Sequence, residues 1–403
     1  MPFMVQLLLL GIAGACVAGQ LNRAIYRWAI FFPRSISPWT PPPTNTPPRT
    51  LTDCIPIWGW WKLRREEQLH GKGFWIRPML LECLVAVGFP LQYWWEMQGG
   101  LIPLSFPVPE PAVLQASCAI HLLLFCFMLI GSVIDMDEKT IPDEVTVYGT
   151  IAGLSLAILF PRVLLPHPIP GPTPEVVPLW LSNPWPIWLD GAKGLAVGLA
   201  CFLGWVYAIL PKLWRTKSGF VMAFRILSAS LWRYAVNRTV GIGLTMGCLT
   251  IILVWWQGGL RWQALLTSLA GLAFGGGLVW SVRIVGTLSL RREAMGFGDV
   301  TLMAMIGSFV GWHPCVIIFF IAPICGVFLA VGQWVTTGRK DIAYGPFLCF
   351  ATWLVVELWC EFWHHGVGDV FHVLGSFISW VLLVCMLMMY FMLTCWRLIT
   401  RQQ

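Results

Sequence analysis

A small group of acidic side chains lies beside the long apolar segments of this sequence, where a carboxylate could take part in chemistry. A charge at the centre of a bilayer costs roughly 2.5–3.5 kcal/mol on insertion scales, so acids at membrane depth tend to be paired or functional. Two of these acids stand where an apolar segment meets a turn, and they are the first candidates for a catalytic pair. The acids near the ends of apolar segments are Glu82, Asp135, Asp190, Asp299 and Glu357.

Asp135 ends an uninterrupted apolar stretch, which makes it the least hydrated acid of its cluster. Pro142 stops this stretch from continuing as one regular helix and predicts a turn before the next apolar segment. Taken alone, an ordinary acid at a helix end is the commoner explanation of Asp135. The other acids of the cluster are better placed in water: Asp137, Glu138, Asp143 and Glu144.

Asp299 follows two glycines in a Gly-Phe-Gly-Asp sequence and is expected to open a helix. Gly296 and Gly298 would allow close backbone approach and unusual φ values. A helix N-terminus also brings a positive dipole end to the carboxylate. Taken alone, a turn in which Asp299 caps the following helix explains the motif equally well.

A pair of carboxylates in a site of limited polarity favours one particular chemistry. The two groups cannot both ionise easily, so they share a proton, as in aspartic peptidases. The ionised member would then deprotonate a water that attacks a peptide carbonyl. The protonated member would hydrogen-bond the carbonyl oxygen and later protonate the leaving amine.

The composition indicates that membrane helices position these acids. The chain has 403 residues, of which 57% are hydrophobic and 11% charged, against about 25% charged in soluble domains. The net charge of +7 is explained by basic loops that mark topology, and we expect no nucleic-acid partner. The 13 cysteines form no C-x-x-C pair, which indicates neither a zinc site nor a disulfide framework.

We predict an all-α polytopic membrane protein of about eleven helices, with the N-terminus outside and the C-terminus cytoplasmic. This orientation places every multi-basic loop inside, following the positive-inside tendency. The proline-rich stretch 38–49 should be extended. Asp135 and Asp299 then both fall at cytoplasmic ends of apolar segments, although 164 positions separate them (299 − 135). The predicted spans are 1–19, 78–95, 113–134, 145–160, 188–210, 239–256, 264–285, 299–312, 316–335, 347–362 and 371–395.

At these residues the chain resembles the type IV leader peptidase (prepilin peptidase) family of Gly-x-Gly-Asp membrane aspartyl peptidases. The family's first motif has a proline seven positions after its aspartate, and IDMDEKTIPDE therefore selects Asp135 over Asp137. The second motif matches over EAMGFGDVTLMAMIGSFVGW (293–312) and selects Asp299. The segments 19–28 and 341–350 also agree. The motif positions that support the two aspartates are Pro142, Asp143, Glu293, Met295, Gly296, Phe297 and Gly298.

The resemblance implies removal of the basic leader from prepilin or pseudopilin precursors, in type IV pilus assembly or protein secretion. Cleavage would occur at the cytoplasmic face of the inner membrane, with substrate and lipid bilayer as partners. Many members also N-methylate the product with S-adenosylmethionine, which the resemblance leaves open here. The paired zinc cysteines of the family are absent, since this loop has only Cys54, so no metal is expected. Thr301 replaces a lysine common in the family.

The resemblance also suggests how the chain is divided. Relative to the family, the larger spacing between the motifs implies two inserted helices, and an even number keeps both aspartates on one face. The expected parts are a first helix (1–19), a basic cytoplasmic loop (20–77), helices with the first motif (78–186), an inserted pair (187–257), the peptidase core (258–362) and an extra C-terminal helix and tail (363–403).

Three other readings compete with a leader peptidase. A proton- or cation-coupled transporter would use Asp135 and Asp299, but it should place acids near mid-membrane and show corresponding halves. A presenilin-like peptidase is expected to have Tyr-Asp in its first motif, where this chain has Ile134 before Asp135. An inactive scaffold could keep both motifs. His121 lies within a span and is expected to have its hydrogen bonds satisfied rather than to ligate a metal.

Overall fold

The computed structural model describes residues 2–31, 36–39, 48–210, 235–337 and 343–400. Each of the eleven predicted apolar segments overlaps a helix. Most of the proline-rich stretch and of the basic segment after residue 210 lie outside the described residues. The helices are α1 Phe3–Trp28, α4 Ile76–Met97, α5 Pro111–Glu138, α6 Asp143–Leu159, α7 Ala192–Ile209, α9 Ala235–Gln257, α10 Gly259–Leu290, α11 Phe297–Val310, α12 Trp312–Thr337, α13 Gly345–Glu357 and α16 Ile378–Thr400.

Several of these helices meet the requirements of a membrane span. By length and composition, five helices among the described residues could cross a bilayer: α1, α5, α7, α10 and α16. A sixth is added if α13 and the segment Trp359–Phe371, bent by 80° from it, form one broken span. The chain is therefore an α-helical membrane protein. Eleven crossings and their orientation stay predictions.

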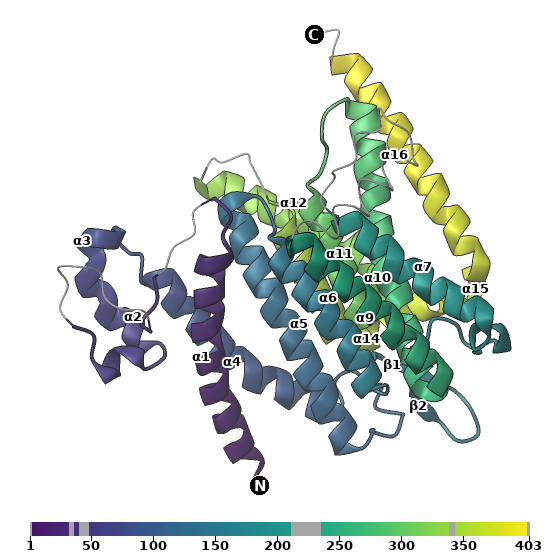
Figure 1. Ribbon diagram of the computed structural model, residues 1–403, viewed down its shortest axis with the longest axis horizontal. Helices are drawn as coiled ribbons and strands as arrows, with labels where there is room; N and C mark the ends of the chain where they lie inside the picture. Colours follow the sequence, from purple (N-terminus) through teal and green to yellow (C-terminus); the bar gives the residue numbers. More distant parts are fainter. Residues whose placement is uncertain (1, 32–35, 40–47, 211–234, 338–342, 401–403) are drawn as a thin grey trace.

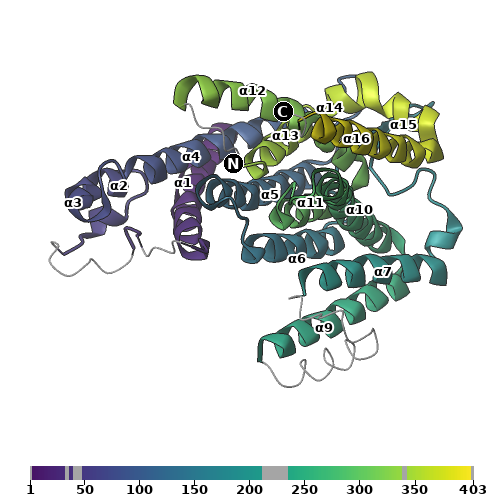
Figure 2. The same cartoon turned by 90° about the horizontal axis from the view of Figure 1, so that it is seen from above.

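The helix that carries Asp299 occupies the centre of the molecule. Every residue of α11 from Asp299 to Val310 is buried. Figure 2 shows α11 between α5, α6 and α10, with α7 and α9 along the outer edge beyond α6. The sequence predicted only a short span here. An apolar helix of 14 residues can be fully buried because its neighbours, rather than lipid, cover it.

The contact between α10 and α11 depends on two glycines. A Cβ on Gly307 would lie 2.1 Å from the carbonyl oxygen of Gly271, and a Cβ on Gly271 would lie 2.1 Å from the carbonyl oxygen of Gly307. Small residues of this kind let the backbones of membrane helices approach closely. The close approach fixes how deeply α11 inserts into the bundle.

We expect Gly307→Ala to lower the thermal unfolding temperature in detergent, followed by circular dichroism. Backbone atoms cannot turn away from the new methyl group, so the helices must separate, at a cost of about 1–3 kcal/mol. Gly277→Ala in α10 is the matched control, because no atom lies within 4 Å of its Cβ position. Equal unfolding temperatures for the two variants would contradict this account of the packing.

The first helix is longer than predicted. α1 continues to Trp28 instead of ending at residue 19, because Leu21, Asn22 and Ile25 are buried. Asn22 donates hydrogen bonds to the Pro78 carbonyl and to Glu82, both in α4. These polar contacts keep a segment with two basic residues, Arg23 and Arg27, helical and attached to the bundle.

Short helices between α1 and α4 form a small body at the left of Figure 1. Salt bridges Arg49–Glu66 and Arg65–Asp53 stabilise it, with N–O distances of 3.0 and 2.7 Å. Its elements are the 3-10 helices Leu51–Cys54 (η1) and Leu63–Glu66 (η2) and the helices α2 Trp58–Lys62 and α3 Glu67–His70.

The ion pair of Asp53 makes the stability of this small body depend on pH. Burial alone would raise the pKa of Asp53, but hydrogen bonds from Thr50 and the charge of Arg65 outweigh it and hold the pKa below its usual 3.8. The stabilisation is therefore complete above this usual value and is lost as pH falls through the lower pKa of the folded protein. We expect the protection of backbone amides from hydrogen exchange within residues 50–66, relative to the intrinsic exchange rate, to fall below about pH 4. Asp53→Asn should remove that pH dependence, and an unchanged dependence in the variant would assign it to another group.

After α6, two predicted spans were wrong, and one predicted loop contains regular structure. The loop before α7 contains an antiparallel hairpin, β1 Pro166–Ile169 and β2 Glu175–Pro178, followed by a short 3-10 helix Ile187–Leu189 (η3). The span expected at 347–362 breaks at Leu358, followed by α14 Trp359–Phe362 and a π-helical turn Trp363–Val367 (η5). The span expected at 371–395 is divided at Gly375, whose φ of +44° ends α15 Gly368–Leu374. A 3-10 turn Gly375–Phe377 (η6) then leads into α16.

Candidate active site

Asp135 lies in the last turn of α5 and is 5% exposed. The helix ends as the sequence predicts: Lys139 adopts a left-handed conformation and donates its N–H to the Asp135 carbonyl, and Pro142 directly precedes α6. The Asp135 side chain is held from a third helix. Its Oδ2 accepts the backbone N–H of Gly345, the first residue of α13, at 3.0 Å.

Asp299 lies in the first turn of α11 and is 7% exposed. Gly296, not Asp299, occupies the N-cap position, so the capping explanation of Asp299 is wrong. The expected unusual φ values are also absent from Gly296 and Gly298. The expected close approach is confirmed, because a Cβ on Gly298 would lie 3.0 Å from the Cβ of Ile141. Gly298 thus lets the start of α11 pack against the turn that follows Asp135.

The structure brings the two predicted aspartates together. Ile141 lies beside both sites: a Cβ on Gly345, which binds Asp135, would lie 3.1 Å from Cδ1 of Ile141, and a Cβ on Gly298, next to Asp299, would lie 3.0 Å from its Cβ. Cys349, from α13, is close enough to both carboxylates to interact with their charges. Within the described part of the chain, neither carboxylate forms an ion pair with a basic side chain. Two buried acids without a cation are the arrangement in which one proton is shared.

The other motif residues lie in or beside the turns at the starts of α6 and α11. Thr301 donates its hydroxyl hydrogen to the Gly298 carbonyl at 3.0 Å. Met295 and Phe297 pack against the main core. Asp143 is exposed at the start of α6, and the Glu293 side chain is 84% exposed.

Arg283, which the sequence indicated only as a topology marker, braces the second motif. Its Nε donates to the Met295 carbonyl at 3.0 Å, and its guanidinium lies 5.7 Å from the centre of the Phe297 ring. An Nη2 contact of 3.4 Å reaches Glu293. A basic residue near the end of an apolar helix was the available signal, but its partners could not be inferred from spacing.

The sequence likewise did not identify Arg77 as a residue of the site. Arg77 braces the first motif. Its Nη1 lies 2.8 Å from both carboxylate oxygens of Asp137, and its Nη2 donates to the Val133 carbonyl at 3.3 Å. These contacts lie two residues before and two after Asp135. Arg77 therefore ties the start of α4 to the helical turn that carries Asp135.

The remaining acids near apolar segments have structural partners. Glu82 accepts the indole N–H of Trp60 and attaches the small body to α4. Asp190 accepts the indole N–H of Trp185 in an exposed loop. His121 is hydrogen-bonded to Glu96 at 2.8 Å, so the expectation of a satisfied histidine is confirmed. Glu357 interacts electrostatically with both Glu96 and His121.

The fold and site define a class: an α-helical membrane protein with two adjacent buried carboxylates from different helices. A model described as the type IV leader peptidase family matches residues 235–331, which include Asp299 but not Asp135. Together with the curated relatives below, this match shows that part of the chain is similar to the type IV leader peptidase family.

Three curated relatives show the extent of the similarity. The prepilin leader peptidase/N-methyltransferase of Aeromonas hydrophila is 33% identical over 120 residues, covering 28% of this chain and 40% of the relative. That of Dichelobacter nodosus is 38% identical over 88 residues, covering 22% and 30%. The type 4 prepilin-like proteins leader peptide-processing enzyme of Escherichia coli O78:H11 is 32% identical over 149 residues, covering 35% and 53%. The chain thus spans about half or less of these relatives' lengths, and no solved structure matches it.

Proposed function

We propose that the chain is a leader peptidase that removes the basic leader from prepilin or pseudopilin precursors. The observation that carries the proposal is the pairing of Asp135 and Asp299, two buried carboxylates that α5 and α11 bring together. Relatives named as prepilin leader peptidases support the substrate class.

In the proposed mechanism the aspartates form one acid–base unit. The ionised carboxylate takes a proton from a water molecule, which attacks the scissile carbonyl carbon. The protonated carboxyl donates a hydrogen bond to the carbonyl oxygen and then supplies the proton to the leaving amine. The Gly345 N–H fixes one oxygen of Asp135. This contact orients the carboxylate before substrate arrives, which is how preorganised sites lower the barrier.

The proposed setting is the inner membrane, with eleven crossings, the N-terminus outside and the active site toward the cytoplasm. Arg77 at the start of α4, and Arg291 and Arg292 just after the end of α10, support this sidedness, because positive residues gather on the cytoplasmic side. The substrate's basic leader would then stay in the cytoplasm while its apolar helix lies in the bilayer.

We propose that peptide cleavage needs no metal or other cofactor. The names of the relatives add N-methylation, for which S-adenosylmethionine would supply the methyl group. A polar hollow of about 440 Å³ beside the first motif is lined by Asp137 and Glu138. Arg77 already pairs with Asp137, and Glu138 accepts the backbone N–H groups of Ile30 and Phe31. Both acidic side chains are thus already engaged within the protein, and we derive no methyl-transfer step.

The function is tested with the purified chain in lipid nanodiscs and a purified prepilin. Mass spectrometry should show loss of the leader and a new N-terminus at the junction between the basic and apolar segments. Adding S-adenosylmethionine reveals any further gain of one methyl group. Intact prepilin, combined with proton or cation flux in proteoliposomes, would instead support the transporter alternative.

A further inference from the structure

A buried polar cluster joins three helices far from the two aspartates. Glu96 in α4 and His121 in α5 are 1% and 3% exposed, and Glu357, the last residue of α13, is half-buried. Oε1 of Glu96 lies 2.8 Å from Nδ1 of His121 and accepts the side-chain amide N–H of Gln92 at 2.8 Å. The proposed peptidase mechanism uses none of these side chains.

Two carboxylate oxygens of this cluster lack a donor. Oε2 of Glu96 and Oε1 of Glu357 are buried, and neither has a hydrogen-bond partner among the residues that the structure describes. Both polar neighbours of Glu96 contact its other oxygen. A buried ionised oxygen without a donor carries its full desolvation penalty. The cluster is therefore incomplete without a ligand that supplies a hydrogen or a positive charge.

The charges of the cluster do not balance either. Glu357 interacts electrostatically with Glu96 and His121, and Cys118 is a further titratable neighbour of both carboxylates. A thiol is uncharged at neutral pH. Within the described part of the chain, neither glutamate forms an ion pair with lysine or arginine. Even with His121 protonated, two carboxylates leave one buried negative charge uncompensated, which burial strongly disfavours.

A proton fits this place better than a metal ion. Among the described residues, no three histidine, cysteine or acidic side chains are placed to hold a metal. A proton needs one carboxyl oxygen only, and it turns an unsatisfied acceptor into a hydroxyl donor. Glu357 directly precedes the break of the chain at Leu358, which is 37% exposed. This break gives the half-buried carboxyl a route for exchanging protons with water.

We propose that Glu96, His121 and Glu357 form a proton-binding site that holds two protons at neutral pH. One proton lies on the His121 imidazole, which then donates to Glu96. The second lies on one of the two carboxyl groups and makes the cluster neutral. Release of this second proton to water leaves a net charge of −1 and an unsatisfied buried oxygen.

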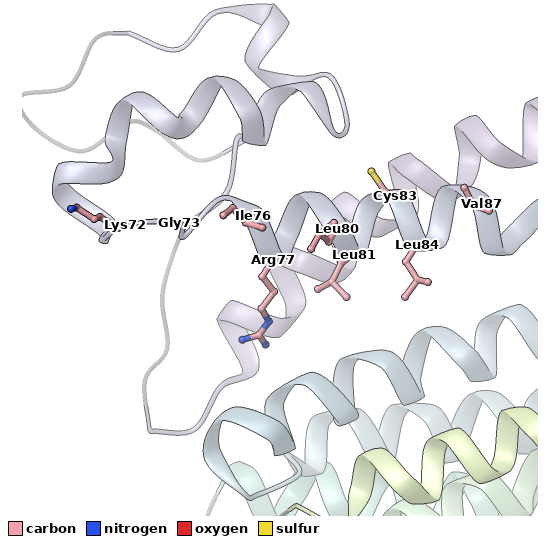
Figure 3. Close-up of a pocket in the computed structure, with 9 residues that line it drawn as sticks. All are labelled: Lys72, Gly73, Ile76, Arg77, Leu80, Leu81, Cys83, Leu84 and Val87. Carbon is pink, nitrogen blue, oxygen red and sulfur yellow. The ribbon is translucent and has the colours of Figure 1, made fainter. Parts of the chain in front are cut away.

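The three helices joined by this site are also those that hold Asp135. At 1.5 Å per residue, Asp135 lies about 21 Å along α5 from the cluster, and Gly345 lies about 18 Å along α13 from it. Figure 3 shows Arg77 extending from the first turn of α4, whose last turn belongs to the cluster. Figure 2 shows α5 beside α4 and α13. The bound protons therefore fasten these helices together at the ends opposite the proposed active site.

Infrared spectroscopy of the full chain in lipid nanodiscs tests for the carboxyl proton. An Asp135→Asn/Asp299→Asn background removes the carboxyl signals of the proposed catalytic pair. It also requires no cleavage, so failure here is distinct from failure of the peptidase proposal. At neutral pH we expect the C=O band of a protonated carboxyl that shifts in heavy water. Glu357→Gln and Glu96→Gln should each remove this band, because each leaves His121 with a single carboxylate in a neutral cluster.

The pH dependence of unfolding provides a second measurement. A free glutamate is ionised above about pH 4.3, so the folded cluster holds more protons than the unfolded chain, and stability falls as pH rises. Between about pH 5 and pH 9 the unfolding temperature of the background should fall about 2–4 °C further than that of Glu357→Gln, whose amide stays neutral. Glu361→Gln is the matched control, because it removes a carboxylate that is 69% exposed four positions along the chain. It should follow the background.

Three results would overturn the proton site. The first is a protonated-carboxyl band that persists in both Glu357→Gln and Glu96→Gln, or in the one that folds if the other does not. The second is an equal fall of unfolding temperature with pH in Glu357→Gln and its background. The third is a rise in the unfolding temperature of the background when sodium replaces choline at high pH, which would assign a metal cation to the cluster instead.

Discussion

Asp135→Asn and Asp299→Asn are each expected to abolish leader cleavage while the protein still folds and inserts normally. Asparagine keeps the size of the side chain but cannot exchange a proton with water or with the leaving amine. Loss of general acid–base catalysis alone lowers rates by about 10²–10⁴-fold. Cleavage of a co-expressed prepilin, followed by the mass shift of the product, measures the effect.

The pair should act as a unit, which gives the experiment a second arm. The double variant Asp135→Asn/Asp299→Asn should be no slower than either single variant, because groups that act together are strongly non-additive. Glu144→Gln is the matched control, since it removes an exposed acid at the start of α6. Wild-type cleavage by either single aspartate variant would show that the dyad assignment is wrong.

The helical framework was predictable because hydropathy reports which segments avoid water. The positions of α5, α6 and α11 follow from apolar runs that end at Pro142 or begin after Gly296. The break at Leu358 and the hairpin before α7 were not predictable from hydropathy. Both arise where the chain turns back on the bundle, and apolar content is similar on either side of such a turn.

The two aspartates could be selected from the sequence, but the residues that hold them could not. Motif spacing identified Asp135 and Asp299, whereas Arg77 and Arg283 looked like ordinary basic residues at helix ends. Their roles depend on contacts between segments far apart in the chain, such as the 56 positions that separate Arg77 from Val133. Hydrogen bonds of this range leave no local pattern in a single sequence.

Among the residues that hold the two aspartates, Gly345 is the clearest example of a long-range contact. Its replacement is expected to have the second large effect on prepilin cleavage. A Cβ at Gly345 would lie 2.6 Å from Oδ2 of Asp135 and 3.1 Å from Cδ1 of Ile141. In Gly345→Ala the Asp135 carboxylate must therefore move and lose its 3.0 Å hydrogen bond. A displacement of about 1 Å at a reacting group can lower a rate by about 10²-fold, and we expect a loss of that order in prepilin cleavage.

The same change should hardly affect stability, which separates a positioning role from a packing role. The atoms that the new methyl group meets are ends of side chains, which can turn away, and alanine favours the helix that begins here. Gly277→Ala provides the control, because it adds an equal methyl group in open space. Cleavage by Gly345→Ala at the rate of that control would contradict the placement of Asp135. If Gly345→Ala lowered both the cleavage rate and the unfolding temperature, Gly345 would be assigned to packing instead. The contact with the carboxylate alone requires slower cleavage at an unchanged unfolding temperature.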